Sequence, residues 1–104
     1  MLARWKAIRA STRARWRAAR AAMANRGSAS TCFYCGVCFA ETGPDHRTVD
    51  HRVARSRGGV DAMRNLVFAC YACNQRKRDR HENEFFTSEW LTARRAEVAR
   101  RPGG

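Results

Sequence analysis

CFYC at residues 32–35 and CYACN at residues 70–74 are the two stretches that decide the fold of this chain. In each, two residues separate a pair of cysteines, which places two sulfur atoms on one turn. Two such pairs complete the tetrahedral ligand set of a structural zinc ion. We therefore predict one structural Zn²⁺ site formed by Cys32, Cys35, Cys70 and Cys73. Cys38 follows Cys35 at the same spacing and could replace Cys32, or remain a free, partly buried thiol.

The size and charge of the chain limit its class and its partners. It has 104 residues, a net charge of +12 and a pI of about 11.1. This length fits at most one domain with a modest core, which a structural metal would help to stabilise. The charge predicts a polyanionic partner, with nucleic acid the first candidate and an anionic membrane surface the second.

The apolar pattern argues against a membrane protein. No stretch approaches the ~20 apolar residues that a membrane span needs. Charged residues interrupt the N-terminal stretch where a signal peptide would need an apolar run. We therefore expect no membrane association and thiols kept in a reducing compartment, the cytoplasm of a bacterium or of a phage-infected host cell.

Three segments are expected from composition and periodicity. Residues 1–27 are rich in alanine and arginine and predict a basic amphipathic helix. Its stripe is Leu2, Trp5, Ile8, Thr12, Trp16, Ala19 and Met23. This helix could be a DNA-binding arm, could pack on the core, or could dock on a membrane surface or a partner. Residues 28–87 form the expected core with short strands, and residues 88–104 a last helix and tail.

Candidate reactive residues lie between and after the cysteine pairs. Asp50 offers a hard oxygen ligand for Mg²⁺ or Mn²⁺, and the imidazole of His51 suits a general base, because histidine is the side chain that most often takes this role near neutral pH. Asn74 offers a carbonyl oxygen beside a zinc ligand. Neighbours on a strand point to opposite faces, so a kink would be needed to bring Asp50 and His51 to one phosphate. Alternatively, His51 is a surface histidine beside a capping aspartate, and Asn74 is only a helix N-cap.

Taken together in this order, these elements resemble the HNH endonuclease family. The elements are a zinc knuckle at 32–36, Asp50-His51, SRGG at 56–59, Asn65-Leu66 and CYACNQRK at 70–77. The resemblance covers about residues 32–78. Two positions depart from the family pattern: Ala54 stands where proline is frequent, and Asn74 stands where some members have histidine.

The resemblance implies a fold, an activity and residue roles. The fold would be small α+β, a ββα-metal (His-Me finger) core with the four-cysteine zinc site and flanking basic helices. The activity would be metal-dependent DNA endonuclease cleavage. Asp50 and Asn74 would hold one Mg²⁺ or Mn²⁺, His51 would activate water, and Asn65 would brace the loop that orients His51. The expected phosphate contacts are Arg57, Arg76, Lys77, Arg78 and Arg80.

Other functions remain open at this level. The chain could be a non-catalytic, zinc-stabilised DNA-binding module. It could also be the nuclease subunit of a phage packaging or restriction assembly, since it holds no separate sequence-reading domain. Double-stranded DNA is the expected substrate and RNA stays open, as do a homodimer and a larger DNA-processing complex.

Overall fold

The computed structural model describes residues 2–25 and 30–102, and within the first helix it describes the side chains of residues 12–23. Helix α1 (Leu2–Asn25) is followed by strand β1 (Arg47–His51), the short 3-10 turns η1 (Arg55–Arg57) and η2 (Met63–Asn65), and strand β2 (Leu66–Cys70). Three helices complete the chain: α2 (Tyr71–Lys77), α3 (Glu82–Phe86) and α4 (Glu89–Arg100). The small α+β class predicted from the sequence is confirmed.

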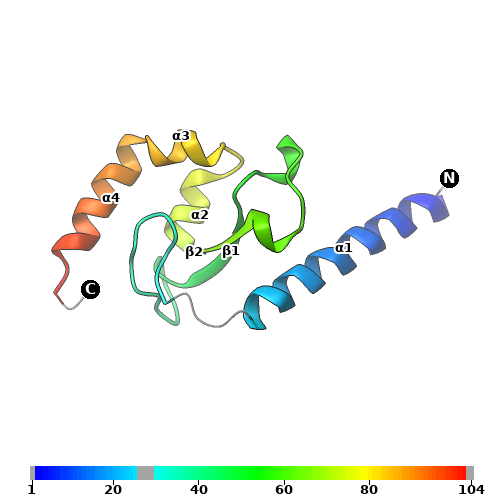
Figure 1. Cartoon of the computed structure of the whole chain (residues 1–104), viewed down its shortest axis with the longest axis horizontal. Helices are drawn as coiled ribbons and strands as arrows, with labels where there is room; N and C mark the ends of the chain where they lie inside the picture. Colours follow the sequence, from blue (N-terminus) through cyan, green and yellow to red (C-terminus); the bar gives the residue numbers. More distant parts are fainter. Residues whose placement is uncertain (1, 26–29, 103–104) are drawn as a thin grey trace.

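A two-stranded antiparallel hairpin forms the centre of the molecule (Figure 1). Its register pairs Arg47 with Cys70 and runs without interruption to the pairing of His51 with Leu66. Helix α2 begins directly after β2, because Cys70 caps it and accepts a hydrogen bond from the Cys73 amide. Asn74 therefore lies inside the helix, so the alternative that it is only a helix N-cap is wrong, and helix α3 was not predicted.

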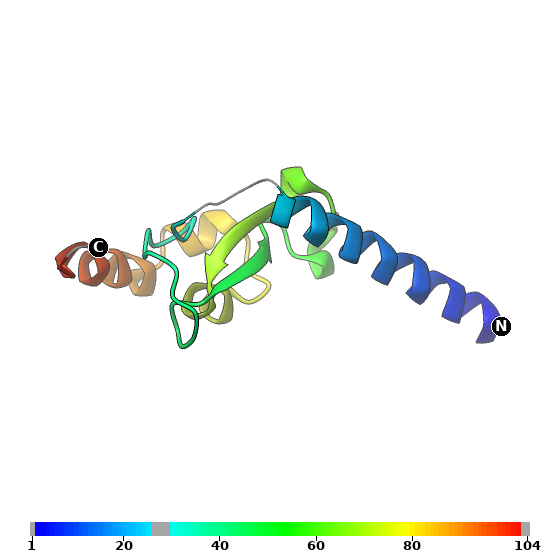
Figure 2. The same ribbon diagram turned by 90° about the horizontal axis from the view of Figure 1, so that it is seen from below.

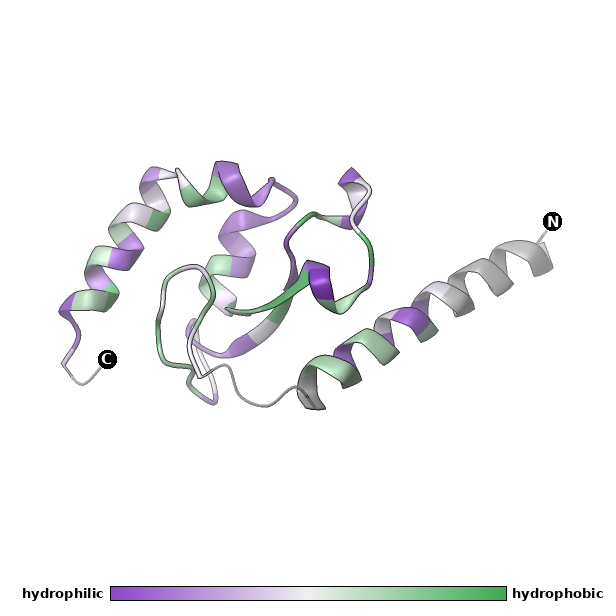
Figure 3. Cartoon of the chain, viewed as in Figure 1, coloured by the Kyte–Doolittle hydropathy of each residue, from purple (hydrophilic) through white to green (hydrophobic). Residues whose placement is uncertain are grey.

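Both faces of the hairpin are covered by apolar side chains. Successive side chains of a strand point to opposite faces, so β2 contributes to both. Val67 and Ala69 face a core built from the four cysteines, Tyr34, Val37 and the apolar residues of α3 and α4. Leu66 and Phe68 face the other way, toward Ala19 and Met23 of α1. Figure 3 shows β2 in the green of hydrophobic residues. The hairpin therefore separates two apolar clusters.

Helix α1 packs on the core through its C-terminal half. Trp16, Ala19 and Met23 recur at helical spacing and contact the second cluster. The N-terminal half projects away from the hairpin (Figure 2), and the molecule measures 55 × 28 × 23 Å. The side chains of Leu2, Trp5 and Ile8 lie outside the described residues. No helix in the described part of the chain is long and apolar enough to cross a membrane.

The last helix, α4, lies within residues 88–104, where the sequence predicted a helix and tail. Ser88 caps α4 by accepting a hydrogen bond from the Leu91 amide. Leu91 and Val98 are buried against the cysteine cluster. Helix α4 therefore covers the side of the cysteine pairs that faces away from α1.

Gly59 is required by close backbone contact. A Cβ atom at this position would overlap the Val53 carbonyl oxygen. We expect Gly59→Ala to lower the free energy of unfolding by about 1–3 kcal/mol, because backbone must move to admit the methyl group. Gly43→Ala is the matched control, since nothing lies within 4 Å of a Cβ there and only the positive φ of 81° opposes it. Urea unfolding of both variants measures the difference, and equal losses would contradict the steric argument.

Candidate active site and metal centre

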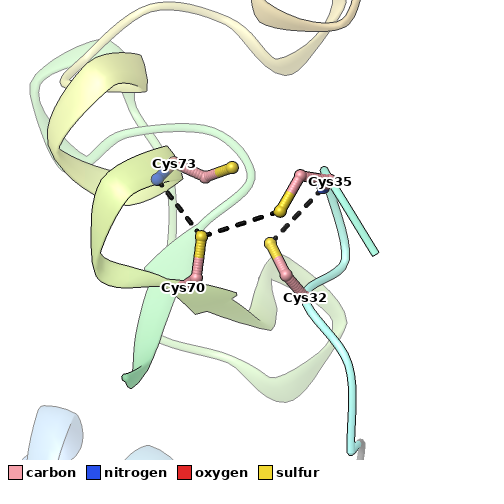
Figure 4. A group of neighbouring side chains, drawn as sticks. All are labelled: Cys32, Cys35, Cys70 and Cys73. Carbon is pink, nitrogen blue, oxygen red and sulfur yellow. Dashed lines mark hydrogen bonds between the residues drawn. The ribbon is translucent and has the colours of Figure 1, made fainter. Parts of the chain in front are cut away.

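Four cysteines converge where the 32–35 turn meets the start of α2 (Figure 4). Their sulfur atoms all lie within 4.8 Å of one another, and the Cys35 and Cys70 sulfurs are 3.7 Å apart. A tetrahedron with Zn–S bonds of about 2.3 Å has S···S edges of about 3.8 Å. The set Cys32, Cys35, Cys70 and Cys73, named the cysteine cluster below, therefore has the spacing and chemistry of a zinc site.

Hydrogen bonds around the cysteine cluster favour thiolate. The amides of Tyr34 and Cys35 donate to the Cys32 sulfur, and the Cys73 amide donates to the Cys70 sulfur. Hydrogen bonds from the other three cysteines hold the pKa of Cys32 well below its ordinary value. The same contacts raise the pKa of Cys73, because its neighbours compete to carry the negative charge. A soft divalent cation resolves this competition by stabilising all four thiolates together.

Arg94 of α4 adds positive charge beside the cysteine cluster. Its Nη2 lies 3.6 Å from the Cys70 sulfur and donates to Asp45 Oδ1 at 2.8 Å. Cys38, by contrast, is exposed and lies outside the cluster. The expectation of a partly buried Cys38 is therefore corrected, and its replacement of Cys32 is not supported.

His51 ends β1 on the face that α1 covers. Its Nε2 lies 2.7 Å from Asp61 Oδ1, and its ring stacks on Trp16 with centroids 4.8 Å apart. The Arg55 guanidinium, with a smaller contribution from His51, holds the pKa of Asp61 below its usual range. Because the ionised carboxylate can only accept, Nε2 is the donor and neutral His51 carries its lone pair on Nδ1.

Asp50 lies on the opposite face of β1, toward α2. It is 6% exposed, and its Oδ2 accepts a 2.6 Å hydrogen bond from the Tyr34 hydroxyl. Burial, reinforced by the charge of Asp50, raises the pKa of Tyr34 and keeps its hydroxyl a donor. The Lys77 ammonium lies 3.2 Å from the same oxygen. Asp50 Oδ1 has no hydrogen-bond partner among the described residues.

Asn74 lies on the same side of the hairpin as Asp50. Its Nδ2 donates to Thr48 Oγ1 at 3.0 Å, and Thr48 shares a strand face with Asp50. The Asn74 Oδ1 accepts no hydrogen bond from the described residues. Asp50 and Asn74 thus each keep one hard oxygen donor, a combination that suits Mg²⁺ or Mn²⁺.

The structure separates Asp50 from His51. The ladder is unbroken through both residues, so their side chains contact different elements, α2 in one case and α1 in the other. The kink expected between them is absent from this described strand.

Asn65 holds the loop that follows His51. Its Oδ1 accepts from the Val53 amide at 2.9 Å, and its Nδ2 donates to the carbonyls of Val53 and Val60 at 2.9 and 3.0 Å. Its own carbonyl accepts from the Arg52 amide. These are the contacts expected of a residue that braces this loop.

Three of the expected phosphate-contacting arginines gather at one cavity. Arg76, Arg78 and Arg80 line a hollow of about 620 Å³ together with Trp90. The Arg78 amide donates to the Asn74 carbonyl at the end of α2, its side chain has no hydrogen-bond or ion-pair partner in the described part of the chain, and its φ is an unusual 54°. Arg57 is exposed on the neighbouring loop and donates to the Asp79 carbonyl at 2.7 Å.

Lys77 does not belong to this surface. It is 0% exposed, and its ammonium donates to the His51 carbonyl at 2.8 Å besides pairing with Asp50. The expected phosphate contact of Lys77 is therefore corrected to a structural role. A signal for this was present in the sequence, because Lys77 follows Cys73 by four residues and so shares its buried helix face.

Asp61 was missed in the sequence analysis. Nothing in the spacing of Asp61 and His51, ten residues apart across a loop, signals their contact. Trp16 was placed only on the apolar stripe of the N-terminal helix, whose role was left open, and its stacking on His51 was not predicted. The path of the loop, fixed by Gly59 and Asn65, brings the three side chains together.

Comparison with known families agrees with this geometry. Residues 32–80 match the family model described as HNH endonuclease, and this segment contains the hairpin, α2 and the cysteine cluster. The resemblance predicted from the sequence is thereby confirmed, and an HNH domain indicates nuclease activity in general. Searches for similar curated proteins and for similar solved structures returned no match.

The cysteine cluster predicts a metal-dependent stability. We expect Cys70→Ser to lower both bound zinc and the melting temperature, because zinc binding contributes directly to folding. Cys38→Ser is the control and should change neither. Metal analysis and thermal unfolding measure the two quantities, and an unchanged melting temperature in Cys70→Ser would argue against a structural metal.

The buried ion pair predicts a second stability effect. Lys77→Met should lower the free energy of unfolding by about 3–5 kcal/mol, because it leaves the Asp50 carboxylate buried without its cation. The double variant with Asp50→Asn should recover part of this loss. Arg78→Met, an exposed control, should change stability by about 0.5 kcal/mol or less. A Lys77→Met variant as stable as this control would show that the pair is not formed.

Proposed function

We propose that this protein is a metal-dependent endonuclease that hydrolyses phosphodiester bonds, with DNA as its substrate. The observation that carries the proposal is the match of residues 32–80 to the HNH endonuclease family. The net charge of +12 supports a polyanionic substrate. The imidazole of His51, whose Nδ1 is free of hydrogen bonds to the described residues, supports its role as general base.

Side chains of this protein supply the proton acceptor, His51, and hold it in place. His51 Nδ1 takes a proton from water as the water oxygen forms a bond to phosphorus and the P–O3′ bond breaks, and the leaving 3′ oxygen takes a proton from solvent. The products are a 5′-phosphate and a 3′-hydroxyl. Asn65 keeps the loop after His51 in place, and Lys77 holds the His51 carbonyl. His51 is the last residue of β1, so a phosphate at this strand end would border both faces of the hairpin.

Asp50 and Asn74 are the residues that would hold the catalytic cation. Each keeps one oxygen that accepts no hydrogen bond from the described residues, and both oxygens are hard ligands. Bound Mg²⁺ or Mn²⁺ supplies positive charge that stabilises the developing negative charge on phosphate oxygens. The cysteine cluster would hold a structural Zn²⁺, which fixes the start of α2 and hence Asn74.

Three exposed arginines and the half-buried Arg80 give the substrate a binding surface. We assign Arg57, Arg76, Arg78 and Arg80 to phosphate contacts, since guanidinium groups bind phosphate oxygens well. Affinity should therefore fall steeply as salt rises. We place the protein in a reducing compartment, acting alone, as a homodimer or within a larger DNA-processing assembly.

A non-catalytic DNA-binding module is the second candidate. The observation that favours it is the pairing of Asp50 Oδ2 with Tyr34 and Lys77, which leaves that oxygen committed to the protein interior. In that case the zinc-loaded protein would bind DNA without cleaving it under any divalent cation.

Cleavage of supercoiled plasmid tests the proposal. Wild-type protein should convert the plasmid to nicked or linear DNA with Mg²⁺ or Mn²⁺ but not with EDTA. His51→Ala should lose cleavage by at least about a hundredfold, the usual contribution of general-base catalysis, while DNA affinity stays unchanged. A preserved rate in His51→Ala would remove His51 from the mechanism. Binding without cleavage by the wild type would favour the second candidate.

A further inference from the structure

Four side chains around His51 form a closed ring of contacts. Trp16 stacks on His51, His51 donates to Asp61, and Asp61 accepts two hydrogen bonds from Arg55 at 2.8 and 3.1 Å. The Arg55 guanidinium completes the ring by lying 4.8 Å from the centroid of the Trp16 ring. These four residues, Trp16, His51, Arg55 and Asp61, are named the His51 quartet.

Each contact in the quartet restricts either the orientation or the tautomer of the His51 imidazole. The indole covers one ring face with an interplanar angle of 25°, which limits rotation about the side-chain bonds. The Asp61 carboxylate fixes Nε2 as the donor. The His51 carbonyl is held by Lys77, so the backbone that carries the ring is also fixed. Only Nδ1 is left without a partner from the described residues.

The quartet is itself anchored from two sides. Trp16 is held by the apolar packing of α1, because Ala19 and Met23 follow it at helical spacing and are buried against Leu66 and Phe68. Asp61 is held by the paired guanidinium of Arg55, which keeps the carboxylate oriented. The loop that carries both residues is fixed in turn by Asn65.

We propose that Trp16 and Asp61 are positioning residues for His51, so that helix α1, which lies outside the family-matched segment, is part of the active site. This inference rests on the proposed function. Trp16 sets the direction of the imidazole ring and Asp61 sets which nitrogen faces the substrate. Misplacing a catalytic group by about 1 Å can cost on the order of a hundredfold in rate.

Single-turnover cleavage separates positioning from substrate binding. Trp16→Leu and Asp61→Asn should each lower the cleavage rate constant at saturating DNA by about tenfold to a hundredfold. The dissociation constant for DNA should change by less than about twofold. Trp16→Phe, which keeps an aromatic ring for stacking, should restore most of the rate. Phe33→Leu and Asp79→Asn are matched controls at exposed positions and should retain the wild-type rate.

A nuclear magnetic resonance measurement reads the geometry without any cleavage. In the zinc-loaded protein, stacking on the indole should shift the His51 ring protons upfield. Trp16→Leu should remove this shift, and Asp61→Asn should broaden or move the same signals. His46 and His81, which belong to other surroundings, serve as internal references, and Phe33→Leu should leave the His51 signals unchanged.

The outcomes distinguish this inference from the proposed function. The positioning role would be supported if the wild type cleaves DNA, both variants cleave it more slowly, and the His51 signals move in both variants. An active wild type with unchanged rates in both variants would overturn it and leave the nuclease intact. A faster Trp16→Leu variant would also overturn it, because α1 would then shield His51 rather than orient it. A wild type that never cleaves would overturn the proposed function, and with it the catalytic meaning of the quartet.

Discussion

The convergence of four sulfur atoms is the constraint on which the remaining structure depends. The cysteine cluster ties the 32–35 turn to the corner where β2 becomes α2. Because α2 starts at this corner, the cluster sets the rotation of the helix, which turns Asn74 and Lys77 toward β1. In a chain of 104 residues with two modest apolar clusters, this one tie replaces much of the core that a larger domain would use.

The candidate catalytic residues lie on two different faces of the hairpin. Asp50 and Asn74 lie with α2 and the cysteine cluster, whereas His51 lies with α1 and the 55–61 loop. Lys77 links the two sides, since its ammonium contacts the Asp50 carboxylate and the His51 carbonyl at once. A change at the zinc site can therefore reach His51 through α2, without a direct contact between them.

What the sequence could predict was set by local spacing. The cysteine pairs predicted the cluster, helical periodicity predicted α1, and the family resemblance predicted the place of Asn65. The contact of Asp61 with His51 was out of reach, because it depends on a loop path fixed by Gly59 and by side-chain bonds from Asn65. The burial of Lys77 was within reach, yet the basic run around it suggested a solvated face. The run of like charges alone does not show which member is buried, whereas the four-residue spacing from Cys73 does.

Hydrogen exchange with and without zinc tests most directly whether the cysteine cluster governs the hairpin and α2. The account predicts that a chelator removes protection from the amides of β1, β2 and α2 together, because the cluster fixes all three. Re-addition of Zn²⁺ should restore protection in the same elements. Loss of protection confined to the 32–38 turn, with the hairpin and α2 still protected, would contradict the account.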